Sequence, residues 1–242
     1  MILSRISKAI REQNWFAVAI EFVIVIAGVV IGFQVTAWNA ARVNQARETA
    51  YIERLRDDFV DIETTTRGGI DSYTEMFEAA DRIMAFIESG EAEPADDAAF
   101  RSDLSSILLG TIPPPRSTTF REMESAGQLS LISDPELREM LIEIDALLAR
   151  YDRVFAFVFT QQDRYGEYLN RYLVYQDTLG ESGVPDVPGV SRYDLAAMRA
   201  DPQFLPAMST LRRGHGFNVF WLHSVHAEVA TLRAALDERI AE

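Results

Sequence analysis

The strongest constraint on this chain is a nearly uncharged stretch of 23 residues, positions 16–38, close to its N-terminus. Glu21 is the only charged residue in it, and Gln34 and one threonine are its only other polar side chains. At 1.5 Å per residue, a helix of this length spans about 35 Å, enough for a hydrocarbon core of about 30 Å. Trp15 and Trp38 bracket the stretch, as tryptophans do at membrane interfaces. The sequence therefore predicts a transmembrane anchor over residues 15–38.

A cleaved signal peptide is the alternative interpretation, because basic residues precede the apolar stretch. The stretch, however, is longer than the apolar region of about 7–15 residues in such peptides, which favours a retained anchor. Three cations precede the span and two, Arg42 and Arg47, follow it within a similar distance. This bias predicts a single-pass protein with its N-terminus on the cytoplasmic side and its C-terminal domain on the outer side of the membrane.

Charge divides the chain into three predicted parts. Residues 1–14 are predicted to form a basic arm, either a short helix that lies on the membrane surface with apolar and cationic residues on opposite faces, or a frayed positive segment. The anchor follows, and residues 39–242 form an acidic extracytoplasmic domain with 20 basic and 35 acidic residues. Such a domain repels phosphate, which argues against nucleic acid as a partner. The absence of cysteine excludes disulfides, thiolate catalysis and cysteine-ligated metals.

Helical periodicity predicts an all-α fold in which the anchor continues into a bundle of about three long helices and several short ones. Apolar or small residues recur every three or four positions over five heptads after the anchor: Ile52, Leu55, Phe59, Ile62, Thr66, Gly69, Tyr73, Met76, Ala80, Ile83 and Ile87. The seam is compatible with an oligomeric coiled coil or with one wall of an intramolecular bundle. Thr66, Gly69 and Ala80 are unfavourable at the core positions of a coiled coil, which favours the bundle. A kink or break is expected at Gly68-Gly69, with a new helix capped by Ser72.

Further helices are predicted over residues 97–108, from a capping box at Thr119, from Ser133 to about Asp177, and from Asp201-Pro202 to the C-terminus. Residues 180–192, which contain several glycines and prolines, are predicted to be a loop.

Two blocks of the sequence resemble an uncharacterised bacterial family of single-span membrane proteins, a domain of unknown function. The anchor block carries Glu21, Gly28, Gly32, Gln34 and Trp38-Asn39. The second block reads Phe120-x-x-Met123-x-Ser-Ala-Gly127-x-Leu129-x-Leu-Ile132-x-Asp-x-x-Leu137-Arg138. The resemblance covers about a third of the chain. It implies a Gram-negative inner-membrane protein with an N-in anchor, and it supplies no activity.

The span carries one candidate contact face. Glu21 is costly inside a bilayer, and the Gly28-x-x-x-Gly32 motif permits close approach of a second helix. Glu21, Gly28 and Gly32 share nearly one helical face, which we expect to meet a partner span, with Gln34 as a further contact and Trp15, Trp38 and Asn39 as interfacial anchors. The alternative is that Glu21 reaches the head groups and that the glycines have no partner.

Candidate chemistry in the acidic domain is sparse. His215, His223 and His226 share the last helix without the spacing of zincin or di-iron motifs, so no metal or cofactor is predicted. A cavity joining His215 or His226 to Asp163 or Glu167 would favour an enzyme. Several tyrosines and phenylalanines between positions 151 and 175 suit either a core or a ligand pocket, and Arg212-Arg213 is a weak candidate anion site.

The sequence thus favours a non-enzymatic, membrane-anchored protein that acts by association, as an accessory subunit or self-assembling scaffold. Its expected partners are the lipid bilayer and, through the span, a second copy or another membrane protein. The alternative is a ligand-sensing helical bundle that signals through a partner membrane protein, and this alternative requires a cavity in the bundle.

Overall fold

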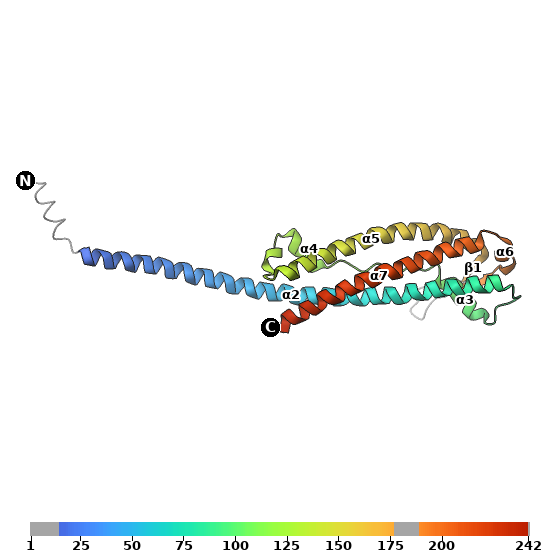
Figure 1. Ribbon diagram of the computed structural model, residues 1–242, viewed down its shortest axis with the longest axis horizontal. Helices are drawn as coiled ribbons and strands as arrows, with labels where there is room; N and C mark the ends of the chain where they lie inside the picture. Colours follow the sequence, from blue (N-terminus) through green and yellow to red (C-terminus); the bar gives the residue numbers. More distant parts are fainter. Residues whose placement is uncertain (1–14, 177–188, 242) are drawn as a thin grey trace, which may run out of the picture. The chain divides into compact units, whose positions relative to one another are not determined.

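The computed structural model describes residues 15–176 and 189–241, and the predicted N-terminal arm lies outside them. The described residues form an all-α fold with six α-helices, as predicted (Figure 1). The long helices are α2 (Trp15–Ser89), α5 (Pro135–Leu169) and α7 (Phe204–Ala241). The short ones are α3 (Asp97–Ser106), α4 (Thr118–Ser125) and α6 (Leu195–Ala200). The chain divides into two compact units, residues 1–50 and 51–242.

Helix α2 runs for 75 residues without interruption, so the predicted break at Gly68-Gly69 and the new start at Ser72 are wrong. The two glycines have different surroundings. A Cβ on Gly68 would meet nothing within 4 Å, whereas a Cβ on Gly69 would lie 3.1 Å from Leu222 Cδ1 of α7. Gly69 therefore marks a close approach between two helices, which the sequence pattern alone does not distinguish from a helix stop.

The residues of the α2 seam are all buried, which confirms the interpretation as a wall of an intramolecular bundle. They contribute to two core clusters. The first joins α2 to the N-terminal part of α5 and the C-terminal part of α7, and its α7 residues begin at Leu222. The second joins the end of α2 to α3, the end of α5 and the start of α7, and its α7 residues end at Leu211. Between these two leucines, α7 places two polar side chains in the interior, His215 and Asn218, each 1% exposed.

Side-chain caps fix the starts of α4 and α5, one or two residues from the predicted positions. Ser117, not Thr119, caps α4 by accepting from the amide of Phe120, and Asp134 rather than Ser133 caps α5. Asp58 of α2 adds a cap across the bundle: its Oδ2 accepts from the Thr119 amide at 2.9 Å and from Ser117 Oγ at 2.8 Å. Burial by itself would raise the pKa of Asp58, but these hydrogen bonds outweigh it and lower that pKa.

A small β-hairpin replaces the expected end of the long helix α5. The helix ends at Leu169 rather than near residue 177, and a 3₁₀ turn, η2 (Asn170–Tyr172), leads into β1 (Leu173–Gln176). Strand β1 pairs antiparallel with β2 (Gly189–Tyr193), which begins inside the predicted loop. Val190 of β2 is buried in the second core cluster, and its amide donates to Ser105 Oγ of α3. Tertiary packing therefore overrides the local helical pattern here.

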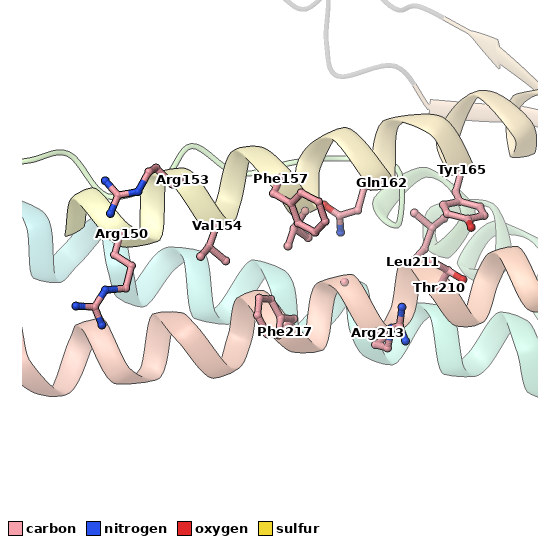
Figure 2. Close-up of a pocket in the computed structure, with 12 residues that line it drawn as sticks. Arg150, Arg153, Val154, Phe157, Gln162, Tyr165, Thr210, Leu211, Arg213 and Phe217 are labelled. Carbon is pink, nitrogen blue, oxygen red and sulfur yellow. The ribbon is translucent and has the colours of Figure 1, made fainter. Parts of the chain in front are cut away.

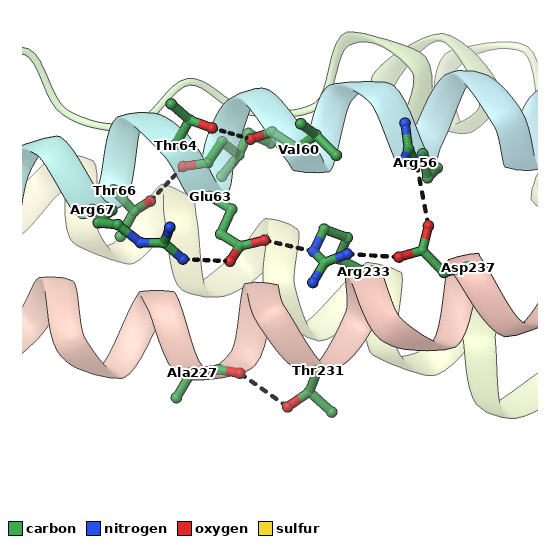
Figure 3. A network of polar contacts seen from close by, with 11 residues as sticks. Arg56, Val60, Glu63, Thr64, Thr66, Arg67, Ala227, Thr231, Arg233 and Asp237 are labelled. Carbon is green, nitrogen blue, oxygen red and sulfur yellow. Dashed lines mark hydrogen bonds and ion pairs between the residues drawn. The ribbon is translucent and has the colours of Figure 1, made fainter.

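An ion-pair chain joins α2 to α7 within the bundle (Figure 3). Glu63 lies at its centre and accepts from Arg233 Nε at 2.6 Å and from Arg67 at 3.0 Å. Arg233 also reaches Asp237, which in turn pairs with Arg56. The Glu63 side chain is only 14% exposed, so this network fixes the register of α7 on α2 more firmly than a surface ion pair would.

Candidate functional site: a groove between helices α5 and α7

A cavity of about 820 Å³ lies between α5 and α7. Its floor is formed by Val158 and Leu211, which are both buried. On α7 its lining runs from Thr210 to Phe217, where the second core cluster ends and before the first begins. We call this cavity the α5–α7 groove. Its volume is in the range of about 300–1,000 Å³ that small-molecule sites occupy.

The walls of the groove are apolar. Val154 and Phe157 of α5 and Phe217 of α7 line the space between the two helices (Figure 2). Phe157 is 67% exposed and Phe217 is 42% exposed, although large aromatic side chains are usually covered. The aromatic residues of α5 thus divide between both predicted roles: Tyr151 is buried in the core, whereas Phe157 and Tyr165 line the groove.

Three arginines surround these walls: Arg150 and Arg153 from α5 and Arg213 from α7 (Figure 2). All three are exposed, and none forms an ion pair within the described part of the chain. The neighbouring Arg212 differs, since its Nε lies 2.5 Å from Asp81 Oδ1 and its guanidinium lies over the Phe77 ring. Of the predicted Arg212-Arg213 pair, only Arg213 therefore faces the groove.

Gln162 separates the groove from the interior. Its side chain crosses α7 at Gly214, where an added Cβ would lie 3.1 Å from Gln162 Nε2. From this position Gln162 Nε2 lies 3.0 Å from Nδ1 of His215, and His215 Nε2 lies 3.1 Å from the carbonyl oxygen of Ile107. The carbonyl can only accept, so His215 Nε2 donates to it and Nδ1 accepts from the Gln162 amide.

This arrangement keeps His215 neutral. Burial lowers the pKa of His215 to about 4, against a smaller opposing effect of its hydrogen bond to Ile107. Both ring nitrogens are occupied by protein hydrogen bonds. His215 therefore offers no free lone pair to a substrate proton or a metal ion.

A second cavity of about 460 Å³ shares Gln162 and Leu211 with the groove, and it brings His215 together with Asp163 and Glu167. A cavity that joins these residues is the arrangement that would favour an enzyme. The engaged ring nitrogens of His215 argue against general-base chemistry there. His223 is exposed and His226 is half-buried, and no group of three metal-ligating side chains occurs among the described residues.

The predicted span residues lie in the first part of α2. One helix among those described, α2, is long and apolar enough to cross a membrane. Glu21, Gly28, Gly32, Gln34, Trp38 and Asn39 are all exposed, and the side chain of Trp15 lies outside the described ones. A Cβ on either of the two glycines would meet nothing within 4 Å. At about 100° per residue, Gln34 is rotated by about 140° from Glu21, so it lies off the shared face of the other three contact residues.

Sequence reasoning missed two of the groove arginines. Arg150 and Arg153 are three residues apart and lie one turn before Val154 and Phe157, so cations and exposed apolar side chains share one helical face. That pattern could be recognised in the sequence. The role of Gly214 could not, because it depends on contact with Gln162 from another helix.

Comparison of the chain with protein-family models, with curated protein sequences and with solved structures gives no significant match. The family resemblance of the two sequence blocks stays a prediction.

Proposed function

We propose that this chain is a single-span inner-membrane protein that acts by binding, and that its helical bundle takes a small ligand with a large apolar part in the α5–α7 groove. The observation that carries the proposal is the groove itself: an apolar cavity of about 820 Å³ with two exposed phenylalanines on its walls. The ligand-sensing alternative requires such a cavity, and a bundle without one would have counted against it.

Anchoring in the membrane is supported by the exposed side chains of α2. Apolar residues of this helix from Ile20 to Val43 are 44–74% exposed, a pattern that a helix contacting only water does not tolerate. In the proposed topology the N-terminus is cytoplasmic, and residues beyond the span lie in the periplasm. The neutral, doubly hydrogen-bonded His215 supports binding rather than catalysis.

The test is binding of a neutral apolar dye, N-phenyl-1-naphthylamine, to the full chain in phosphatidylcholine nanodiscs. Two matched variants share a helix and a substitution: Phe217→Asp changes the groove wall, and Phe220→Asp changes an exposed phenylalanine that does not line the groove. We expect saturable binding that weakens about tenfold in Phe217→Asp and stays unchanged in Phe220→Asp. Equal binding by both variants would refute the groove as the ligand site.

Association through the span is the second candidate function. It is favoured by the open surface at Gly28 and Gly32, where a neighbouring helix would meet bare backbone. A pull-down of the tagged chain from its native membrane in mild detergent tests it. We expect a stoichiometric membrane protein or a second copy to be recovered, and to be lost in a Glu21→Leu/Gly28→Leu variant. A monomer that the variant does not alter would contradict this candidate.

A further inference from the structure

We propose that the ligand of the α5–α7 groove is a single-chain anionic amphiphile, with one alkyl chain and a terminal carboxylate. The inference rests on the proposed ligand binding in this groove and adds the chemical class of the ligand. It follows from the combination of apolar walls with three arginines around them.

The apolar part of the ligand is indicated by what the groove presents to water. Val154, Phe157 and Phe217 form its walls, and buried Val158 and Leu211 form its floor. The lining runs along α5 from Arg150 to Tyr165, a distance of about 22 Å at 1.5 Å per residue. An extended alkyl chain fits a lining of this length and covers the exposed phenylalanines.

The charge of the ligand is indicated by the arginines. The domain beyond the span holds 35 acidic and 20 basic residues, and exposed arginines without an ion pair in the described ranges also occur singly away from the groove, as at Arg121, Arg164 and Arg192. Elsewhere in the bundle, arginines such as Arg82 and Arg116 pair with carboxylates. Arg150, Arg153 and Arg213 border one groove and form no ion pair within the described ranges. A guanidinium group matches a carboxylate in geometry and in charge.

The two features are arranged as an amphiphile requires. Arg150 and Arg153 lie at one end of the groove and Arg213 lies toward the other (Figure 2). These arginines are exposed, so a carboxylate bound to the Arg150 and Arg153 pair keeps part of its hydration, while the alkyl chain lies over the buried floor. No acidic side chain lines the groove among the described residues, although Asp152 interacts electrostatically with Arg153. A neutral alcohol of equal length lacks the ionic contacts, and an alkylammonium would be repelled.

The experiment uses the absence of cysteine from the chain. Phe217→Cys places a single thiol in the groove, and Phe220→Cys places one on the same helix outside the groove. Each full-length protein is reconstituted in phosphatidylcholine nanodiscs, and the rate of maleimide labelling is measured with increasing dodecanoate, dodecanol or dodecyltrimethylammonium. We expect dodecanoate to slow labelling at position 217 but not at position 220, and dodecanol to require about tenfold more.

A second comparison isolates the arginines. Arg150→Gln/Arg153→Gln removes the two groove cations that lie together on α5, and Arg164→Gln/Arg192→Gln removes two exposed cations that do not line the groove. Exposed ion pairs contribute modestly, so we expect the groove variant to need about threefold to tenfold more dodecanoate for protection, with dodecanol unchanged. Because one ligand is compared across variants, its partition into the bilayer cancels.

The outcomes separate this inference from the proposed function. Equal protection by dodecanoate and dodecanol, insensitive to the arginine variant, would overturn the anionic head group and leave an apolar site. Failure of every amphiphile to protect position 217 would remove the ligand site altogether. Protection without added amphiphile that disappears on dilution would also overturn the inference, because the groove would then be covered by a second copy of the chain.

Discussion

The neutral state of His215 predicts a specific loss of stability in acid. The side chain is 1% exposed, and its folded-state pKa is about 4, against an ordinary value of 6.5. The pKa is lowered on folding, so between these two values the unfolded chain binds a proton that the folded chain rejects. Stability from this residue is therefore complete above about pH 6.5 and is lost as the pH falls toward 4.

The magnitude follows from the difference between the two pKa values. One pKa unit corresponds to about 1.4 kcal/mol, so a separation from 6.5 to about 4 is worth about 3 kcal/mol in full. By about pH 4.5, linkage predicts a loss of roughly 2.5 kcal/mol relative to pH 7.5. This loss is a large part of the free energy of unfolding of a typical domain, which is about 5–15 kcal/mol.

The assay is urea unfolding followed by fluorescence of Trp221, which packs against the first core cluster. Replacing Trp15 and Trp38 by phenylalanine leaves Trp221 as the only tryptophan. The control is His215→Gln, which keeps an amide donor for the Ile107 carbonyl but does not titrate. Acidic groups titrate in both proteins, so only the difference between the two pH profiles is interpreted.

We expect the free energy of unfolding of the parent to fall relative to His215→Gln by about 2.5 kcal/mol between about pH 7.5 and 4.5. Parallel profiles for the two proteins would refute the reasoning, because they would show that His215 binds its proton equally well in the folded and unfolded states.

Three further predictions use the same unfolding assay, at neutral pH and, for Asp58, also in acid. Gly68→Ala should stabilise the bundle by about 0.5–1 kcal/mol, because alanine has the higher helix propensity. Gly69→Ala should stabilise it less or destabilise it, because the added Cβ would lie 3.1 Å from the buried Leu222 side chain. Equal stabilisation by the two variants would contradict the close approach of α7. Asp58→Asn should lower the free energy of unfolding by about 1–2 kcal/mol, because it weakens the cap of α4. This difference should shrink as the pH falls below the lowered pKa of Asp58, because the carboxylate of the parent protein is then protonated and also caps α4 less well. Glu63→Gln should cost about 1–3 kcal/mol, since it weakens two arginine contacts on a side chain that is 14% exposed; no change in the urea midpoint would show that the ion-pair chain contributes nothing.

Much of the fold follows from local pattern. The three-and-four spacing of the α2 seam and the continuation of the helix through residues 154–159 could be predicted, because each depends on neighbours within a few residues. The β-hairpin was not readable. Tyr172 and Leu173 continue a helical spacing, and only packing against α3 and α6 decides that the chain extends there.

The candidate site divides in the same way. An apolar stretch long enough to span a membrane, an acidic domain and an all-α bundle could be predicted from the sequence, because composition and periodicity are properties of segments. Packing of the bundle was needed to show that Gly214 admits Gln162, that His215 is held neutral, and that three arginines border one apolar groove. These features depend on which faces of α5 and α7 meet, and that is set by side chains far apart in the chain.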